Sequence, residues 1–194
     1  MPDFAVIAGG PSVRKSEVEQ LRHYQITTIA VNKAANNLPW VDYAFTLDCW
    51  NLAHRFNSFK LEHGKKIVAL KPGFKHKLPD ETEFVPRIPW QDTMDPLAIR
   101  TGNSAIGAYE LAMKLGADRI FLFGCDCAEF GKHWYPNDIW KNKPSSLEIF
   151  SQTLPLWNKL MPVVETFNVS MISQIERFPK ITFEECLCLL LPAS

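Results

Sequence analysis

Short apolar runs alternate with longer segments of mixed polarity along most of the chain. The run 26–31 (ITTIAV) is β-branched and largely apolar, and 119–123 (RIFLF) is similar, as expected for strands buried on both faces. Alternating strands and helices favour an α/β fold with a Rossmann-like, mostly parallel sheet and helices on both faces. We expect strands at 4–8, 26–31, 41–47, 66–70, 83–85, 119–123 and 163–168, and helices at 16–24, 49–56, 105–115, 147–160 and 182–191.

Three positions carry signals for helix ends. Ser16, with Glu19 three residues later, predicts a capped helix start, and Thr182 with Glu185 predicts another. Pro155 lies inside an expected helix, where it lacks the N–H that the helix needs and its ring clashes with the preceding turn. We therefore expect Pro155 to end or kink that helix.

Composition narrows the class of protein. The 194 residues, 46% hydrophobic and 22% charged, are ordinary for a globular protein and predict one domain over 1–194. Lysine and arginine number 21 and so do aspartate and glutamate, which argues against a general nucleic-acid binder. No run approaches the roughly 20 apolar residues of a membrane span and the sequence opens on an expected strand, so we expect a cytoplasmic protein. The five cysteines lack the spacing of zinc or redox motifs and are expected to be free and buried.

The first expected strand stops at Gly9, Gly10, Pro11 and Ser12. Glycine lets the backbone approach a ligand closely, and the N–H groups at the start of the following helix attract an anion. The turn is therefore a candidate phosphate site, although its spacing is neither G-x-G-x-x-G nor that of a P-loop. A tight strand-to-helix turn without a ligand explains the same residues.

Polar residues also follow other expected strands, namely Asn32, Asp48 and Asp126. Because the carboxyl ends of parallel strands meet at one edge of a sheet, we expect these residues to share a rim with the glycine turn. Carboxylates there can bind a metal ion or a ribose hydroxyl, or can cap a turn. His133, in a polar and aromatic stretch, is a candidate general base, and a loop histidine packed by its aromatic neighbours explains it equally.

Several short motifs, taken in this order, resemble a known family. They are VIAGGPS, a VN that ends the second strand, TGNSA, FGCD, and the closing FNVSMIS with FPKITFEE. Together they look like the MptE-like group, also called domain of unknown function 115. That group is related to motility-accessory-factor glycosyltransferases and, more distantly, to bacterial sialyltransferases that use a CMP-sugar. The resemblance spans most of the chain and implies a nucleotide-binding, Rossmann-type transferase.

The resemblance also implies roles for individual residues. In the sialyltransferases the glycine-rich turn, the asparagine after the second strand and a Thr-Ser-Gly-like segment contact the nucleotide, and a lid histidine is the base. The matching nucleotide-binding positions here are Gly9, Gly10, Pro11, Ser12, Asn32, Thr101, Gly102 and Ser104, with Asp48 where the sialyltransferases have an asparagine. The matching base is His133, in a lid-like loop at about 127–146, and Asp126 is the second catalytic candidate. The negative charge of Asp48 would lie near a CMP phosphate.

Three hypotheses follow. The first is a glycosyltransferase-like enzyme whose partners are a nucleotide or nucleotide-sugar and an unidentified acceptor. The second is pyrophosphoryl transfer of the MptE type with Mg²⁺ as cofactor, for which Asp48 and Asp126 are the candidate ligands. The third is a non-catalytic nucleotide-binding protein on the same fold. The apolar tail 187–191 suits either the core or a contact between two copies of the chain.

Overall fold

The structure is a computed structural model that describes residues 2–47, 61–70, 82–87, 99, 103–127, 134, 145–160 and 163–192. These residues form the strands β1 (Asp3–Ile7), β2 (Ile26–Val31), β3 (Tyr43–Thr46), β4 (Lys65–Leu70), β5 (Thr82–Pro86), β6 (Arg119–Phe123) and β7 (Glu165–Asn168). They also form the α-helices α1 (Lys15–Val18), α3 (Ser104–Lys114), α4 (Ser145–Lys159) and α5 (Phe183–Leu190), and the 3₁₀-helices η1 (Glu19–His23) and η2 (Asn32–Asn37). The helix expected at 49–56 lies outside the described residues.

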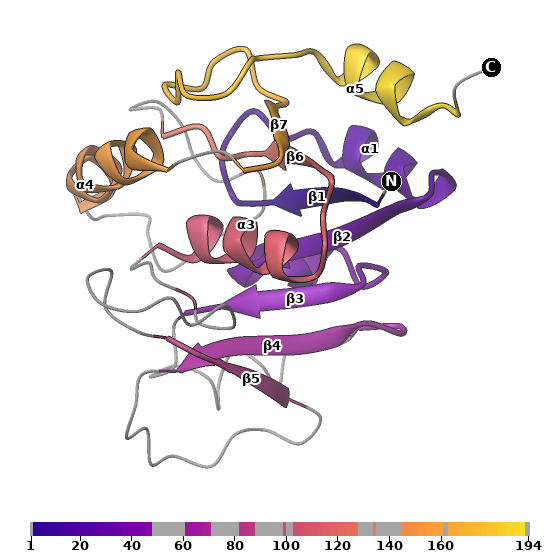
Figure 1. Cartoon of the computed structure of the whole chain (residues 1–194), viewed down its shortest axis with the longest axis horizontal. Helices are drawn as coiled ribbons and strands as arrows, with labels where there is room; N and C mark the ends of the chain where they lie inside the picture. Colours follow the sequence, from indigo (N-terminus) through magenta and orange to yellow (C-terminus); the bar gives the residue numbers. More distant parts are fainter. Residues whose placement is uncertain are drawn as a thin grey trace.

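The strands form one seven-stranded parallel sheet in the order β5-β4-β3-β2-β1-β6-β7. From β1 the chain moves outward strand by strand to β5, and then returns to place β6 on the other side of β1. The strand order therefore reverses at β1, and the arrowheads of β1, β3 and β4 point to the same side in Figure 1. The expectation of an α/β fold with a Rossmann-like parallel sheet is confirmed.

Alternate residues along the strands enter two apolar cores, one on each face of the sheet. Phe4 and Val6 of β1 belong to the core that contains the buried residues of α3 and α4. Ala5 and Ile7 belong to the other core, with residues of α1, η1, η2 and α5. Helix α3 crosses in front of the sheet in Figure 1 and packs closely, since a Cβ at Gly107 would lie 2.9 Å from the Phe45 ring. Helices on both faces are thus confirmed.

The first helix differs from the expectation. Helix α1 begins at Lys15 after Arg14, whose side chain makes no capping hydrogen bond, so the predicted cap at Ser16 is wrong. After one turn the chain tightens into η1. A 3₁₀-helix has three residues per turn, which places Val18 and Leu21, three positions apart, on the same side. Both are buried in the same core, so the apolar contacts of this segment are kept in the tighter turn.

The other helix starts follow capping chemistry. The Asn103 side chain accepts hydrogen bonds from the N–H groups of Ala105 (2.9 Å) and Ile106 (3.1 Å) and so begins α3. At α5 the predicted capping box is confirmed, because the N–H of Glu185 donates to the Thr182 hydroxyl and the N–H of Thr182 donates to the Glu185 carboxylate. In both helices a side chain accepts hydrogen bonds from the first N–H groups, which fixes the residue at which the helix begins.

Pro155 does not end its helix, because α4 continues to Lys159. The turn after the proline is held by packing. Trp157 is 1% exposed and lies edge-on to the rings of Tyr109 and Phe178, with centroid separations of 6.0 and 6.1 Å. Burial of the Trp157 indole offsets part of the cost of the proline. The expectation that the helix ends at Pro155 is therefore wrong, and the alternative of a kink there stays a prediction.

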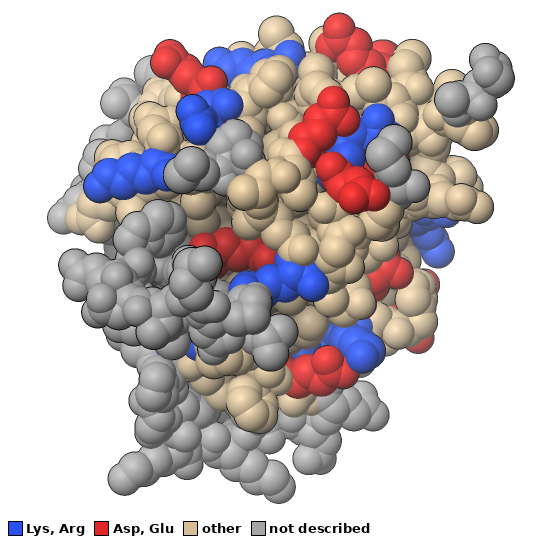
Figure 2. Space-filling view, in the orientation of Figure 1, with Lys and Arg blue, Asp and Glu red and all other residues tan. Residues whose placement is uncertain are grey.

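No helix in the described part of the chain is long and apolar enough to cross a membrane. On the face shown in Figure 2, basic and acidic side chains are interspersed rather than gathered by sign. This distribution agrees with the balanced composition.

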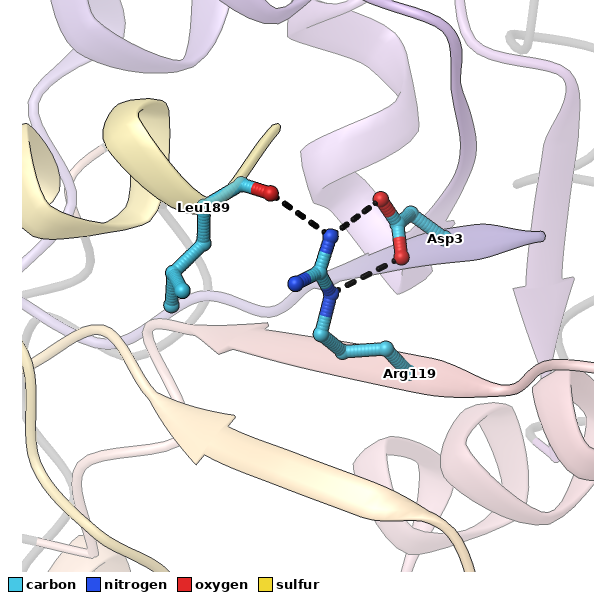
Figure 3. Close-up of polar contacts among 3 residues, drawn as sticks. All are labelled: Asp3, Arg119 and Leu189. Carbon is cyan, nitrogen blue, oxygen red and sulfur yellow. Dashed lines mark hydrogen bonds and ion pairs between the residues drawn. The ribbon is translucent and has the colours of Figure 1, made fainter. Parts of the chain in front are cut away.

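Arg119 links the amino-terminal ends of β1 and β6 to the last helix, α5 (Figure 3). Its guanidinium donates two hydrogen bonds to the Asp3 carboxylate, at 2.9 and 2.7 Å, and a third to the carbonyl of Leu189 at 2.7 Å. The Arg119 and Asp3 side chains are only 18% and 11% exposed. The paired carboxylate raises the pKa of Arg119, so the charge is fixed. Strands β1 and β6 and helix α5 are thereby joined.

Replacing Arg119 by methionine should lower the free energy of unfolding by about 2–3 kcal/mol, because the Asp3 carboxylate would lose its partner while largely buried. Urea denaturation measures the loss. The matched control is Lys65→Met, which breaks the Lys65–Glu83 ion pair of 2.9 Å, whose side chains are 59% and 55% exposed. That control should change stability little, since solvent screens exposed pairs. Equal losses of unfolding free energy in Arg119→Met and Lys65→Met would contradict this stabilising role of Arg119.

Candidate functional site

The candidate site lies at the carboxyl ends of the central strands. Among the predicted site residues, the structure describes Gly9, Gly10, Pro11, Ser12, Asn32, Ser104 and Asp126. The others, Asp48, Thr101, Gly102 and His133, lie outside the described residues, as does nearly all of the lid-like loop. The described residues form two groups on the rim, one where the strand order reverses and one at the ends of β2 and β3.

The first group is built around Asp126, just beyond β6. Its carboxylate accepts hydrogen bonds from the Ser12 N–H (2.9 Å), the Ser12 hydroxyl (2.6 Å) and the Ser170 hydroxyl (2.6 Å). Its carbonyl accepts the N–H of Gln174 at 2.8 Å. Asp126 is 2% exposed. The residues after β1, β6 and β7 therefore meet at one carboxylate.

The glycine turn fits tightly against this group. The N–H of Gly10 donates to the carbonyl of Gly124 at 2.9 Å. A Cβ at Gly10 would lie well inside van der Waals contact with both the Asp126 carboxylate and that carbonyl. Gly124 has φ +64°, which a glycine adopts without strain. Close approach between two backbone segments, rather than approach to an external ligand, accounts for Gly10 in this structure.

The second group surrounds Asn32, the first residue after β2. Its side-chain oxygen accepts the Thr46 hydroxyl at 2.5 Å, and its backbone has φ +53°. Ser104, at the start of α3, accepts the N–H of Leu47 at 3.4 Å. The structure thus brings Asn32 and Ser104, two predicted nucleotide-binding residues, to the adjoining ends of β2 and β3.

Strand register shows how the two groups relate. Ile7 of β1 pairs with Ala30 of β2, and Val31 pairs with Phe45 of β3, so Gly9 follows β1 at the level at which Asn32 follows β2. Among the described residues, the non-glycine residues with positive φ are Asn32 and Cys127, both on this rim. Backbone strain of this kind concentrates at functional sites. The expectation that the polar strand ends share one rim is met by Gly9–Ser12, Asn32 and Asp126.

Two residues outside the predicted set belong to the rim. Ser170 follows β7, and the rule that polar residues after strands share an edge would have found it. Trp134 donates its indole N–H to the carbonyl of Ala8 at 2.8 Å and its backbone N–H to the carbonyl of Gly9 at 3.4 Å. No sequence signal indicates those bonds, because they join Trp134 to residues far away in the sequence, 126 positions in the case of Ala8.

Metal binding finds little support in the described residues, which contain no group of three or more histidine, cysteine, aspartate or glutamate side chains suited to an ion. Both oxygens of Asp126 already accept hydrogen bonds from the protein. An ion at this carboxylate would have to displace those bonds. The Mg²⁺ hypothesis therefore depends on Asp48, which is not among the described residues.

A concave region of about 310 Å³ lies near the amino-terminal ends of β2 and β3, at the opposite ends of the strands from the rim. Its lining includes Arg22, Trp40, Asp42 and His63, and none of the predicted site residues. Asp42 there accepts the N–H and the hydroxyl of Thr28, at 2.7 and 2.8 Å. This region is separate from the rim.

No protein-family profile matches the chain, and no curated protein sequence matches it. The structure is similar to that of the monofunctional alpha-2,3-sialyltransferase Cst-I from Campylobacter jejuni, with 15% identity, 94% of this chain and 81% of that chain covered, and a TM-score of 0.50. It is also similar to the sialyltransferase CstII from the same bacterium in complex with CMP-3FNeuAc, with 10% identity, coverages of 94% and 86%, and a TM-score of 0.47. At these identities the comparison supports the fold alone. The MptE-like resemblance stays a prediction.

Three buried thiols are held protonated, two just after β6 at the rim and one in α5. Burial raises the pKa of Cys127 to about 12, with a further contribution from the Asp126 charge, and burial raises that of Cys186 to about 12 as well. Burial also raises the pKa of Cys125 well above its ordinary value. Since the thiolate is the nucleophile, these cysteines are unsuited to covalent catalysis. The expectation of free, buried cysteines is confirmed for these three and is wrong for Cys188, which is free but exposed, while Cys49 lies outside the described residues.

Iodoacetamide at neutral pH should therefore modify the exposed Cys188 rapidly and leave Cys125, Cys127 and Cys186 unmodified until the protein unfolds. Mass spectrometry of a Cys49→Ser variant, with Cys188→Ser in that background as the control, measures the modification. Rapid labelling of Cys127 in the folded protein would contradict the burial that raises its pKa.

Replacing Gly10 by alanine should destabilise the protein by about 1–3 kcal/mol, because the added Cβ overlaps the Asp126 carboxylate and the Gly124 carbonyl. Thermal and urea unfolding measure the loss. The same substitution in an Asp126→Ala background should cost less, since one of the two overlaps is then removed. A Gly10→Ala protein as stable as the wild type would show that the turn is looser than described.

Proposed function

We propose that this chain binds a nucleotide-sugar at the rim above β1, β2 and β3 and transfers the sugar to an acceptor. The observation that carries the proposal is that Asn32 and Ser104 are hydrogen-bonded to the neighbouring residues Thr46 and Leu47 at the end of β3, on the edge where parallel sheets bind ligands. The fold shared with the sialyltransferase Cst-I supports a transferase of this kind. The motifs that resemble the MptE-like group support it independently.

In this proposal Asn32 and Ser104 contact the nucleotide, together with Thr101 and Gly102. Asn32 has the conformation and position for this role, since its positive φ turns the backbone at the strand end. Hydroxyl and amide side chains can bind a ribose or a base without a metal ion. Asp48, the departure from the sialyltransferase pattern, bears on which nucleotide is accepted, because a carboxylate near a phosphate is repulsive.

The proposed chemistry is displacement at the anomeric carbon. The acceptor oxygen forms a bond to that carbon, the bond to the nucleotide phosphate breaks, and the electron pair leaves with the phosphate. The proton of the acceptor hydroxyl goes to His133, the candidate general base. The next residue in the chain, Trp134, donates hydrogen bonds to the carbonyls of Ala8 and Gly9, which supports a role at the rim for His133. Holding donor and acceptor in line supplies much of the rate enhancement.

Isothermal titration with CMP, CDP, UDP, GDP and ATP, each with and without Mg²⁺, tests the binding site. Asn32→Asp keeps the oxygen that accepts the Thr46 hydroxyl and adds a negative charge, so it should weaken binding of the preferred nucleotide about tenfold or more. Asn36→Asp, the same change at an exposed position in η2, is the matched control and should bind as the wild type does. Ser104→Ala should weaken binding by a smaller factor.

The outcomes separate the hypotheses. Binding of CMP or a nucleoside diphosphate without Mg²⁺, with release of free sugar or its transfer from the matching donor, supports the proposal. Binding of ATP that requires Mg²⁺ would replace it with phosphoryl or pyrophosphoryl transfer. Nucleotide binding without turnover of any donor would leave a non-catalytic binding protein. Equal effects of Asn32→Asp and Asn36→Asp would place the nucleotide elsewhere.

A further inference from the structure

The Asp126 carboxylate is a buried acidic group whose partners in the described part of the chain are hydrogen-bond donors. It is 2% exposed, and no lysine, arginine or histidine of the described residues forms an ion pair with it. Its three donors are the Ser12 N–H and the hydroxyls of Ser12 and Ser170. Moving an isolated carboxylate out of water is costly, and charged hydrogen bonds of 2.6–2.9 Å are strong enough to offset that cost.

These donors have the geometry of an anion site. They come from two segments far apart in the sequence and converge on the two oxygens of one carboxylate. Gly10 has no Cβ to intrude on the carboxylate, so the glycine of the turn makes room for the anion. A ligand phosphate was expected to occupy such a position, and here a side chain of the protein occupies it.

We propose that the N–H and hydroxyl of Ser12 and the hydroxyl of Ser170 form an anion-binding site, with room left by Gly10, and that the protein fills it with its own Asp126 carboxylate. Asp126 is then a positioning residue, which fastens the glycine turn to the segments after β6 and β7, rather than a base or a metal ligand. Without the carboxylate, the same donors should accept a small external carboxylate such as formate.

One consequence rests on the proposed function. The Ser12 donors are already used, so the phosphate of a bound nucleotide has to be held from the Asn32 and Ser104 side of the rim. Loss of Asp126 should then disturb nucleotide binding indirectly, by releasing the turn, and formate should restore it.

The test measures the melting temperature of Asp126→Ala with increasing sodium formate, with sodium chloride as the salt control. Formate should raise the Tm of Asp126→Ala saturably, by about 3 °C or more, and should not do so in the wild type or in the exposed-site control Asp118→Ala. The double variant Asp126→Ala/Ser12→Ala should lose most of the response.

Formate enriched in ¹³C should show saturable line broadening with Asp126→Ala only. A formate response no larger than that of the wild type would overturn the proposal.

A second variant covers the case in which Asp126→Ala does not fold. Asp126→Asn keeps the shape but cannot satisfy all three donors as a carboxylate does, so its Tm should fall by about 3 °C or more. A Tm equal to that of the wild type would overturn the proposal. Nucleotide affinity, measured where every variant is folded, separates positioning from a purely structural role: Asp126→Asn should bind several-fold more weakly than Asp118→Ala. If the wild type binds no nucleotide, the proposed function fails, while the formate result still decides the anion site.

Discussion

A buried carboxylate that must be fully hydrogen-bonded constrains the centre of this protein. Asp126 sits where the strand order reverses, and its bonds to Ser12 and Ser170 hold together the segments that leave β1, β6 and β7. Because an unpaired charge in this position would be costly, the three segments have little freedom to move apart. The absence of a side chain at Gly10 and the positive φ of Gly124 follow from the same constraint.

A largely buried carboxylate lies near each end of β1, and the two carboxylates have different kinds of partner. At its start, Asp3 is neutralised by the Arg119 guanidinium, which also reaches α5. At its end, the partners of the Asp126 carboxylate among the described residues are hydroxyl and N–H groups. The first arrangement is an ion pair that stabilises the edge away from the candidate site. The second surrounds a carboxylate near the rim with hydrogen-bond donors from the segments after β1 and β7, which bears on where an anionic ligand can bind.

The candidate site is accordingly asymmetric. On the side of the strand-order reversal, the donors of the glycine turn are used within the protein, and Trp134 covers the carbonyls of Ala8 and Gly9. On the side of β2 and β3, Asn32 and Ser104 present short polar side chains at strand and helix ends. A parallel sheet with a polar edge of this kind is a scaffold on which different functions can be built, and the residues of the edge decide which one.

The sequence by itself determined the layers of this protein. The β-branched runs and the capping box at Thr182 are local signals, and the strands and α5 appear close to where those signals predict them. Tertiary structure decided the features that depend on distant partners. In α4, which continues through Pro155, Trp157 packs against the distant rings of Tyr109 and Phe178. In the segment where η1 replaces part of a predicted α-helix, Val18 and Leu21 pack into a core shared by several elements. It also placed the Asp126 carboxylate against the glycine turn. Ser12, Asp126 and Ser170 come together only because β1, β6 and β7 are neighbours in the sheet.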